Sequence, residues 1–120
     1  LIDALLGAAT TPRIQIAHLF SCLPKIGISE QEIPVVEINR LAEGLAAAGV
    51  AVEISERWRC PTARVALILA DAGVRLVAGT DSHRAVTVGV YDYVTEVMTS
   101  IDATAADLES DLESWRSLWT

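Results

Sequence analysis

The chain has 120 residues, of which 52% are hydrophobic and 5% aromatic, and its formal net charge is −7. This length allows one domain with a modest core, so residues 1–120 are interpreted as a single domain. The acidic balance and the lack of a Lys/Arg block argue against a nucleic-acid-binding protein. No apolar run approaches the roughly 20 residues of a membrane span, and no signal-peptide pattern is present, which predicts a cytoplasmic protein without a membrane partner.

Helix and strand patterns alternate along the chain. Apolar residues at helical spacing are followed by short β-rich segments, and Pro and Gly mark the boundaries between them. The loop at residues 19–29 is unusually rich in apolar residues, so we expect it to pack down on the domain. The predicted elements, in chain order, are helix 1–9, strand 14–17, helix 34–48, strand 50–54, helix 61–72, strand 74–78, helix 88–101 and, after a capping box at 104–107, helix 108–119.

Two of these units are near repeats. Ala47-Ala-Gly-Val50 precedes one predicted strand and Asp71-Ala-Gly-Val74 precedes the next. Strands that alternate with helices of this length favour an α/β fold with a parallel sheet and right-handed crossovers.

Polar residues follow three successive predicted strands. His18 follows the first, Glu53 lies near the end of the second, and Asp81 and His83 follow the third. The carboxyl ends of parallel strands form the edge where ligands bind in such folds. Asp81 and His83 are two positions apart, so in extended backbone their oxygen and nitrogen donors can converge on one ion. An Asp-x-His pair also occurs in ordinary loops, where the aspartate forms a turn.

Three segments together resemble the polymerase and histidinol phosphatase (PHP) superfamily of metal-dependent phosphoesterases. Ile16-Ala-His18 with the following Pro24-Lys-Ile-Gly loop is similar to the family's strand–His segment. Gly49-Val-Ala-Val-Glu-Ile54 is similar to its Glu-Ile-Asn strand, and Gly79-Thr-Asp-Ser-His83, with Val88-Gly89 downstream, to its final motif. The resemblance covers the chain from about Ile14 to Tyr91.

The resemblance implies a distorted (βα)7, TIM-like barrel that hydrolyses phosphate esters. His18, Asp81 and His83 would be ligands of divalent Zn, Mn or Fe ions, with Asp81 and His83 at the catalytic centre. Glu53 would support the ligands or face the substrate without binding metal itself. The substrate would be a small phosphorylated molecule.

The sequence departs from the family in two ways. Ser55 stands where the family often has Asn, and no His-x-His pair or further early ligand is present. The chain also begins inside a predicted helix without methionine, so we expect it to be the C-terminal part of the barrel. Alone it should bind metal weakly, hydrolyse little and self-associate as a homo-oligomer through the unpaired edge at residues 14–17. The alternatives are a non-catalytic or degenerate metal-binding domain and the polymerase-associated exonuclease branch.

Several residues have both a functional and a structural interpretation. Glu53 could hydrogen-bond loop amides or pair with Arg57, and His18 could be a structural histidine. Trp58 could be a packing anchor or a wall for the substrate. Cys22 and Cys60 lack CxxC spacing, which predicts inert free thiols in a reducing compartment. Four cations could either hold a substrate phosphate or form ordinary surface ion pairs: Lys25, Arg57, Arg59 and Arg84.

Overall fold

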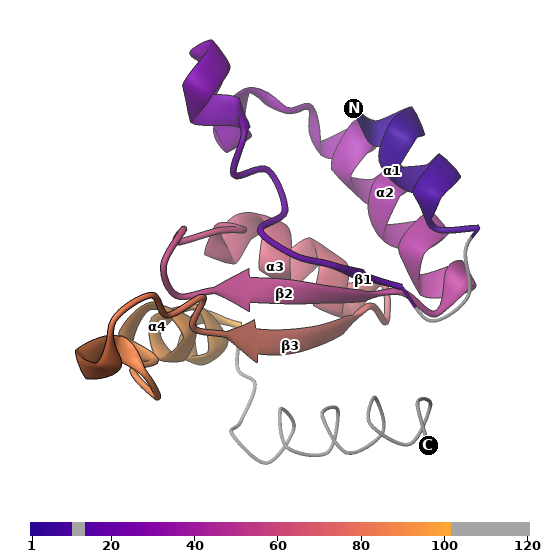
Figure 1. Cartoon of the computed structure of the whole chain (residues 1–120). Helices are drawn as coiled ribbons and strands as arrows, with labels where there is room; N and C mark the ends of the chain where they lie inside the picture. The colour runs from indigo at the N-terminus through magenta and orange to yellow at the C-terminus, as the bar shows by residue number, and fades with distance from the viewer. Residues whose placement is uncertain (11–13, 102–120) are drawn as a thin grey trace.

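The computed structural model describes residues 1–10 and 14–101 and contains a three-stranded parallel sheet (Figure 1). The strands are β1 (Gln15–Ile16), β2 (Ala51–Ser55) and β3 (Arg75–Gly79), in the order β1-β2-β3. Both neighbouring pairs are parallel, and Ser55 lies opposite Gly79 at the carboxyl end of the longer pair. The α/β class and the parallel sheet predicted from the sequence are therefore confirmed.

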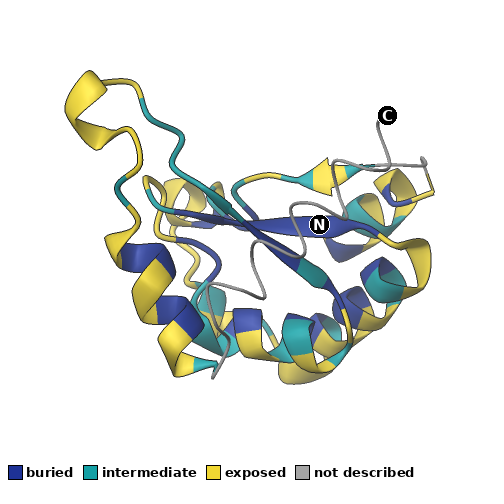
Figure 2. Cartoon of the chain, turned by 90° about the horizontal axis from the view of Figure 1, so that it is seen from below, coloured by how far each residue is buried: buried dark blue, intermediate teal, exposed yellow. Residues whose placement is uncertain are grey.

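Four α-helices accompany the sheet in the described part of the chain. They are α1 (Ile2–Ala8), α2 (Val35–Ala48), α3 (Ala63–Asp71) and α4 (Asp92–Ser100), with short 3-10 helices η1 (Leu23–Ile26), η2 (Glu30–Glu32) and η3 (Ala85–Thr87). Most helical residues lie on one side of the sheet and turn their buried faces toward it (Figure 2). The predicted helix 108–119 and its capping box lie outside the described residues.

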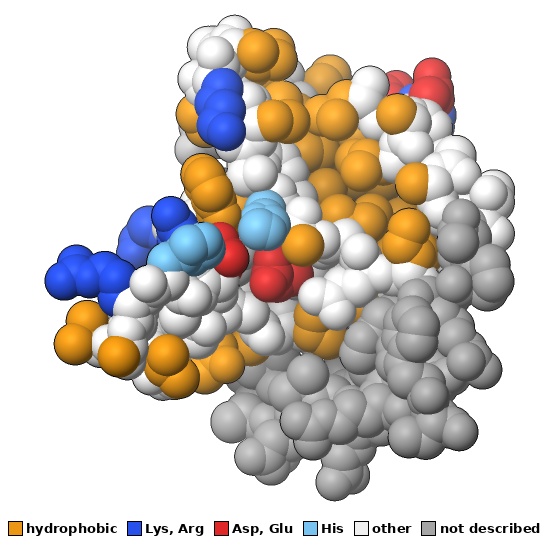
Figure 3. Space-filling model, in the orientation of Figure 1, with side chains coloured by type: hydrophobic (Ala, Val, Ile, Leu, Met, Phe, Trp, Pro, Cys, Tyr) orange, Lys and Arg blue, Asp and Glu red, His pale blue; other side chains and the backbone are white. Residues whose placement is uncertain are grey.

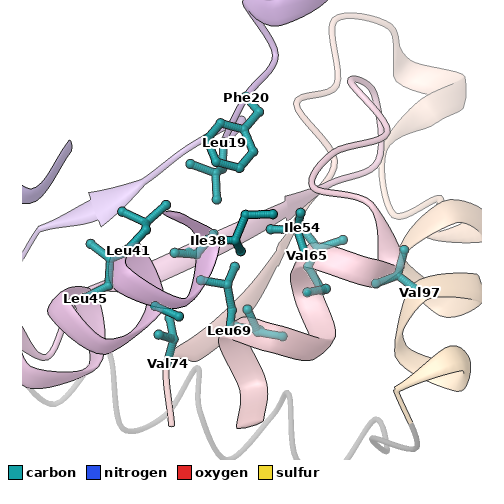
Figure 4. Close-up of a cluster of buried hydrophobic side chains, with 14 of the residues drawn as sticks. Leu19, Phe20, Ile38, Leu41, Leu45, Ile54, Val65, Leu69, Val74 and Val97 are labelled. Carbon is teal, nitrogen blue, oxygen red and sulfur yellow. The ribbon is translucent and has the colours of Figure 1, made fainter. Parts of the chain in front are cut away.

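The core fills the space between the sheet and the helices. Ile54 of β2 packs in one cluster with Leu41 of α2, Leu69 of α3 and Val97 of α4 (Figure 4). Because side chains alternate along a strand, Glu53 and Ser55 point to the opposite face from Ile54. The strand therefore places Val52 and Ile54 against the helices and carries Glu53 and Ser55 to the other side.

The loop between β1 and α2 is only partly packed down. Leu19, Phe20 and Leu23 are buried against the core, as the apolar composition predicted. Ile26 and Ile28, in contrast, are 66% and 38% exposed, so part of the apolar loop remains on the surface.

The helix predicted over 88–101 begins four residues later than expected. Val88 follows η3 and is exposed, and Tyr91 stands at the N-cap of α4. The start is set by Glu56, whose carboxylate accepts the backbone N–H groups of Tyr93 and Val94, both at 2.9 Å. The N-terminal boundary of α4 is therefore fixed by Glu56, which follows β2, and not by the spacing of apolar residues within the helix.

Candidate functional site

The polar residues after the three strands gather at one edge of the sheet. Both histidines of the chain lie on the same face of the molecule, with acidic side chains beside them and arginine or lysine side chains around them (Figure 3). This arrangement follows from the parallel pairing, because all three strands end in the same direction.

Glu53 connects the ends of all three strands. Its side chain is buried, and Oε2 accepts the backbone N–H of His18 at 3.0 Å, beyond the end of β1. On the other side Oε1 lies 1.8 Å from where a Cβ on Gly79 would be, so only glycine leaves room for this carboxylate at the end of β3. Of the two interpretations of Glu53, the bond to a loop amide is confirmed.

Asp81 and His83 meet beyond β3. The imidazole Nδ1 of His83 lies 3.9 Å from Asp81 Oδ1 and 2.8 Å from the backbone carbonyl oxygen of Asp81. The other carboxylate oxygen, Oδ2, accepts the indole N–H of Trp58 at 2.7 Å. The Asp81 side chain is 25% exposed and that of His83 63%, so both groups are open to a ligand.

Arg57 competes with the Asp81 backbone for His83. Its Nη1 contacts Nδ1 of the imidazole and lies 4.0 Å from Asp81 Oδ2. When Nδ1 carries a proton, it donates to the carbonyl oxygen but cannot accept from a guanidinium. When Nδ1 carries no proton, it accepts from the guanidinium but cannot donate to the carbonyl oxygen. The two contacts are therefore alternatives. The tautomer with Nδ1–H leaves Nε2 as the lone-pair donor that a metal ion needs.

A tight turn after β2 presents Arg57, Trp58 and Arg59. The turn is closed by a bridge between Ser55 and Cys60, with Ser55 N–H donating to the Cys60 carbonyl at 2.8 Å. The backbone N–H of Trp58 donates to Ser55 Oγ at 3.3 Å. Ser55, the position that departs from the family pattern, therefore shapes this turn.

His18 reaches the same turn through Trp58. The imidazole and indole ring centroids lie 5.9 Å apart at an interplanar angle of 57°. Both His18 and Asp81 have left-handed backbone, with φ of 48° and 45°. Such conformations cost roughly 1–3 kcal/mol for a residue with a side chain and often occur at functional sites. They turn the chain at the ends of β1 and β3, where the candidate ligands stand.

The four cations predicted to bind phosphate lie in three different settings. Arg57 and Arg84 line a pocket of about 340 Å³ together with Asp81 and His83. Lys25 instead lies over the Trp58 ring, with Nζ 5.6 Å from the ring centroid. Arg59 turns away to stack on Tyr93 at 4.6 Å and lies 3.7 Å from Glu96, so it forms an exposed surface pair.

Glu56 lines the same pocket and was not singled out from the sequence. Besides capping α4, it continues the sheet through its backbone N–H, which donates to the Gly79 carbonyl at 2.8 Å. The usable signal was its position just beyond a predicted strand, which is the criterion that selected His18 and Asp81.

The two cysteines are not part of the site. Both are free thiols, and Cys60 is buried. Burial, with Glu30 and Glu53 nearby, raises the pKa of the Cys60 thiol to about 12, so it stays neutral and a poor nucleophile at physiological pH.

Carboxylate and imidazole are suitable donors for Zn, Mn and Fe ions. Within residues 1–10 and 14–101, however, no three His, Cys, Asp or Glu side chains are grouped so that they could hold an ion. Asp81 and His83 are brought together, whereas His18 meets them through Trp58. The carboxylate and imidazole groups suit a metal ion. In this structure Arg57 contacts the His83 imidazole, and Trp58 donates to the Asp81 carboxylate.

Comparison of the sequence with protein-family models gives no match, and comparison with curated proteins gives none either. Among the described helices, none is long and apolar enough to cross a membrane.

Proposed function

We propose that the chain contributes to a metal-dependent phosphoesterase of the PHP type, as one part of a (βα)7, TIM-like barrel. One observation supports this function most: Asp81 and His83 lie side by side beyond the carboxyl end of a parallel strand, in one pocket with Arg57 and Arg84. Metal donors next to two guanidinium groups suit a phosphate ester, because the fork of arginine matches phosphoryl oxygens.

Asp81 and His83, with His18 as a further donor, would hold a divalent Zn, Mn or Fe ion. Such an ion supplies Lewis acidity, which activates water as a nucleophile and offsets charge on the phosphoryl oxygens. Glu53 keeps the His18 backbone in place by accepting its N–H. Trp58 fixes the direction of the Asp81 carboxylate by donating to Oδ2, which leaves Oδ1 facing His83.

Arg57 has a dual role in this proposal. Without phosphate, its guanidinium rests against His83 and near Asp81. A bound phosphate ester would draw the guanidinium toward its oxygens, since a doubly charged phosphate attracts it more strongly than a neutral imidazole. Once Arg57 has left, Nδ1 of His83 could carry a proton and donate to the Asp81 carbonyl, which is the tautomer that serves as a ligand through Nε2.

A second candidate is a non-catalytic or degenerate metal-binding domain. The contact between Arg57 and His83 favours it over the phosphoesterase, because a permanent contact there would keep Arg57 from binding a phosphate. The polymerase-associated exonuclease branch is the less favoured relative, given the formal charge of −7.

The first experiment measures Mn²⁺ binding by this chain with isothermal titration calorimetry, with and without inorganic phosphate. We expect weak binding of an ion by the wild type and a loss of about tenfold or more in affinity for His83→Ala. Arg57→Ala should bind Mn²⁺ more tightly than the wild type, because a competing cation is gone, yet bind phosphate more weakly. Arg59→Ala is the matched control, since it removes the same charge from the same turn without touching His83.

These outcomes separate the candidates. Metal-dependent phosphate binding that is lost in Arg57→Ala supports the phosphoesterase. Metal binding without any phosphate binding supports the non-catalytic domain. If His83→Ala binds Mn²⁺ as the wild type does, both are wrong. Turnover of 4-nitrophenyl phosphate is expected once the early ligands of the family, which this sequence lacks, are supplied on the same protein.

A further inference from the structure

The pocket that contains Asp81 and His83 has two walls, and both are attached to the start of α4. One wall is formed by residues 56–57, in the turn after β2, and the other by residues 80–90, in the segment after β3. The second segment runs directly into α4. The first is bonded to it through Glu56, whose carboxylate accepts backbone N–H groups in the first turn of α4. The start of α4 is therefore placed to set how far apart the two walls lie.

Tyr93, in the first turn of α4, holds the far end of the turn after β2. Its hydroxyl donates to the backbone carbonyl of Pro61 at 2.8 Å, and both residues are buried. Burial raises the pKa of the Tyr93 phenol to about 12, so the hydroxyl keeps the proton that it donates. Glu56 and Pro61 flank the part of the turn that carries Arg57 and Trp58. The start of α4 thus contacts this turn at both ends, although Tyr93 does not line the pocket itself.

The turn after β2 has a strained backbone, so surrounding contacts must hold it. Arg59 has left-handed backbone, with φ of 49°. A residue with a side chain keeps this conformation only where the surrounding structure fixes it. The Arg59 side chain contributes little, because its stack on the Tyr93 ring and its ion pair lie on the surface. The turn is held instead by the backbone bridge of Ser55 with Cys60 and by the Tyr93 hydroxyl.

The geometry points to Tyr93 as a positioning residue for phosphate binding, which acts through Pro61 to keep Arg57 close to His83. This inference rests on the proposed phosphoesterase function. Without the hydroxyl bond, the turn would relax away from residues 80–90 and take the Arg57 guanidinium with it. Metal and phosphate affinity should then change in opposite directions, because Arg57 competes with a metal for His83 and attracts a phosphate. A residue that only stabilised the fold would not produce opposite changes.

The experiment compares the full chain and its Tyr93→Phe variant by isothermal titration calorimetry with Mn²⁺ and with inorganic phosphate. Phenylalanine keeps the buried ring and removes only the hydroxyl. We expect Tyr93→Phe to bind Mn²⁺ about threefold more tightly and, with Mn²⁺ present, to bind phosphate about threefold more weakly. Tyr91→Phe is the matched control. It removes a hydroxyl at the N-cap of the same helix from a residue that is 40% exposed, and it should change neither affinity.

A double-mutant cycle on Mn²⁺ affinity tests whether the effect passes through Arg57. In Arg57→Ala no guanidinium is left to move, so adding Tyr93→Phe should cause no further change. A gain of equal size in both backgrounds would overturn the inference. Affinities for Mn²⁺ and phosphate that Tyr93→Phe leaves unchanged, or weakens together, would also overturn it. Circular dichroism checks that the variant is folded; if it is not, the same titrations with trimethylamine N-oxide, which favours the folded state, make the comparison.

Failure of this inference and failure of the proposed function give different results. Metal-dependent phosphate binding that Arg57→Ala weakens and Tyr93→Phe does not would keep the proposed function and overturn the role of Tyr93. Tighter Mn²⁺ binding by Tyr93→Phe, in a chain that binds no phosphate, would keep Tyr93 as the residue that holds Arg57 and overturn the phosphoesterase. A wild type that binds neither Mn²⁺ nor phosphate would overturn both.

Discussion

Two kinds of carboxylate lie at the carboxyl edge of the sheet. Glu53 and Glu56 direct their oxygens at backbone N–H groups, of His18 in one case and of Tyr93 and Val94 in the other. Asp81 directs its oxygens at side chains, those of Trp58 and Arg57. A backbone amide is fixed by the fold, whereas an indole or guanidinium can move aside. The glutamates therefore hold the edge together, and the aspartate is the group that can change partners.

The largest effect on folding is expected at Gly79, which makes room for Glu53. In Gly79→Ala the new Cβ would displace Oε1 and with it the bond to His18, so the free energy of unfolding should fall by about 2–3 kcal/mol. Urea unfolding followed by circular dichroism measures this. Gly7→Ala is the control, because it lies in α1 with no atom within 4 Å of the new Cβ, and it should be neutral or stabilising. An unchanged midpoint for Gly79→Ala would mean that Glu53 can leave its place freely.

The second effect concerns Glu56, the carboxylate that caps α4. Glu56→Ala should lower the free energy of unfolding by about 1–2 kcal/mol, as the loss of a helix cap does. Glu96→Ala, on the exposed side of the same helix, removes an equal charge and should cost less than about 0.5 kcal/mol. If both substitutions cost the same, the cap contributes no more than a surface ion pair.

A much smaller effect on stability is expected for Asp81. Asn accepts left-handed backbone readily and can still accept the Trp58 N–H, so Asp81→Asn should change the free energy of unfolding by less than about 0.5 kcal/mol. Mn²⁺ affinity should nevertheless fall, because an amide is a weaker donor than a carboxylate. A large loss of stability in the same urea experiment would mean that Asp81 stabilises the fold as Glu53 and Glu56 do, and the proposed difference between the two kinds of carboxylate would be wrong.

An effect that is absent at neutral pH comes from Cys60, a buried free thiol. Its pKa rises from 9.0 to about 12 on folding, so above pH 9 the unfolded chain loses a proton that the folded chain keeps. Stability is therefore complete below about pH 9 and declines as the pH approaches 12. Urea midpoints between pH 8 and 10 should fall more in the wild type than in Cys60→Ala. Staying at or below pH 10, the usual pKa of Tyr93, limits the contribution of its phenol.

The elements that depend on local pattern were predictable from the sequence. Helix α2 ends where the sequence indicated and begins one residue later, with Pro34 as its N-cap, because Pro34 and Gly49 mark its ends and its apolar face repeats at helical spacing. The gathering of His18, Glu53 and Asp81 at one edge followed from parallel strand order.

The predicted start of α4 was wrong, because the observed start depends on Glu56, which lies 37 residues before Tyr93 in the chain. The contacts of Arg57 and Trp58 with His83 and Asp81 depend on a turn whose shape no spacing rule gives. The metal and the substrate remain predictions.

The hydrogen bond between the His18 amide and Glu53 also has a consequence for hydrogen exchange. β1 has only two residues, and an amide just beyond so short a strand would ordinarily exchange with solvent quickly. With a buried carboxylate as its acceptor, the His18 amide instead opens only when Glu53 moves. Its exchange rate, read from nuclear magnetic resonance, thus reports the integrity of the sheet edge in a single signal, without any ligand or substitution.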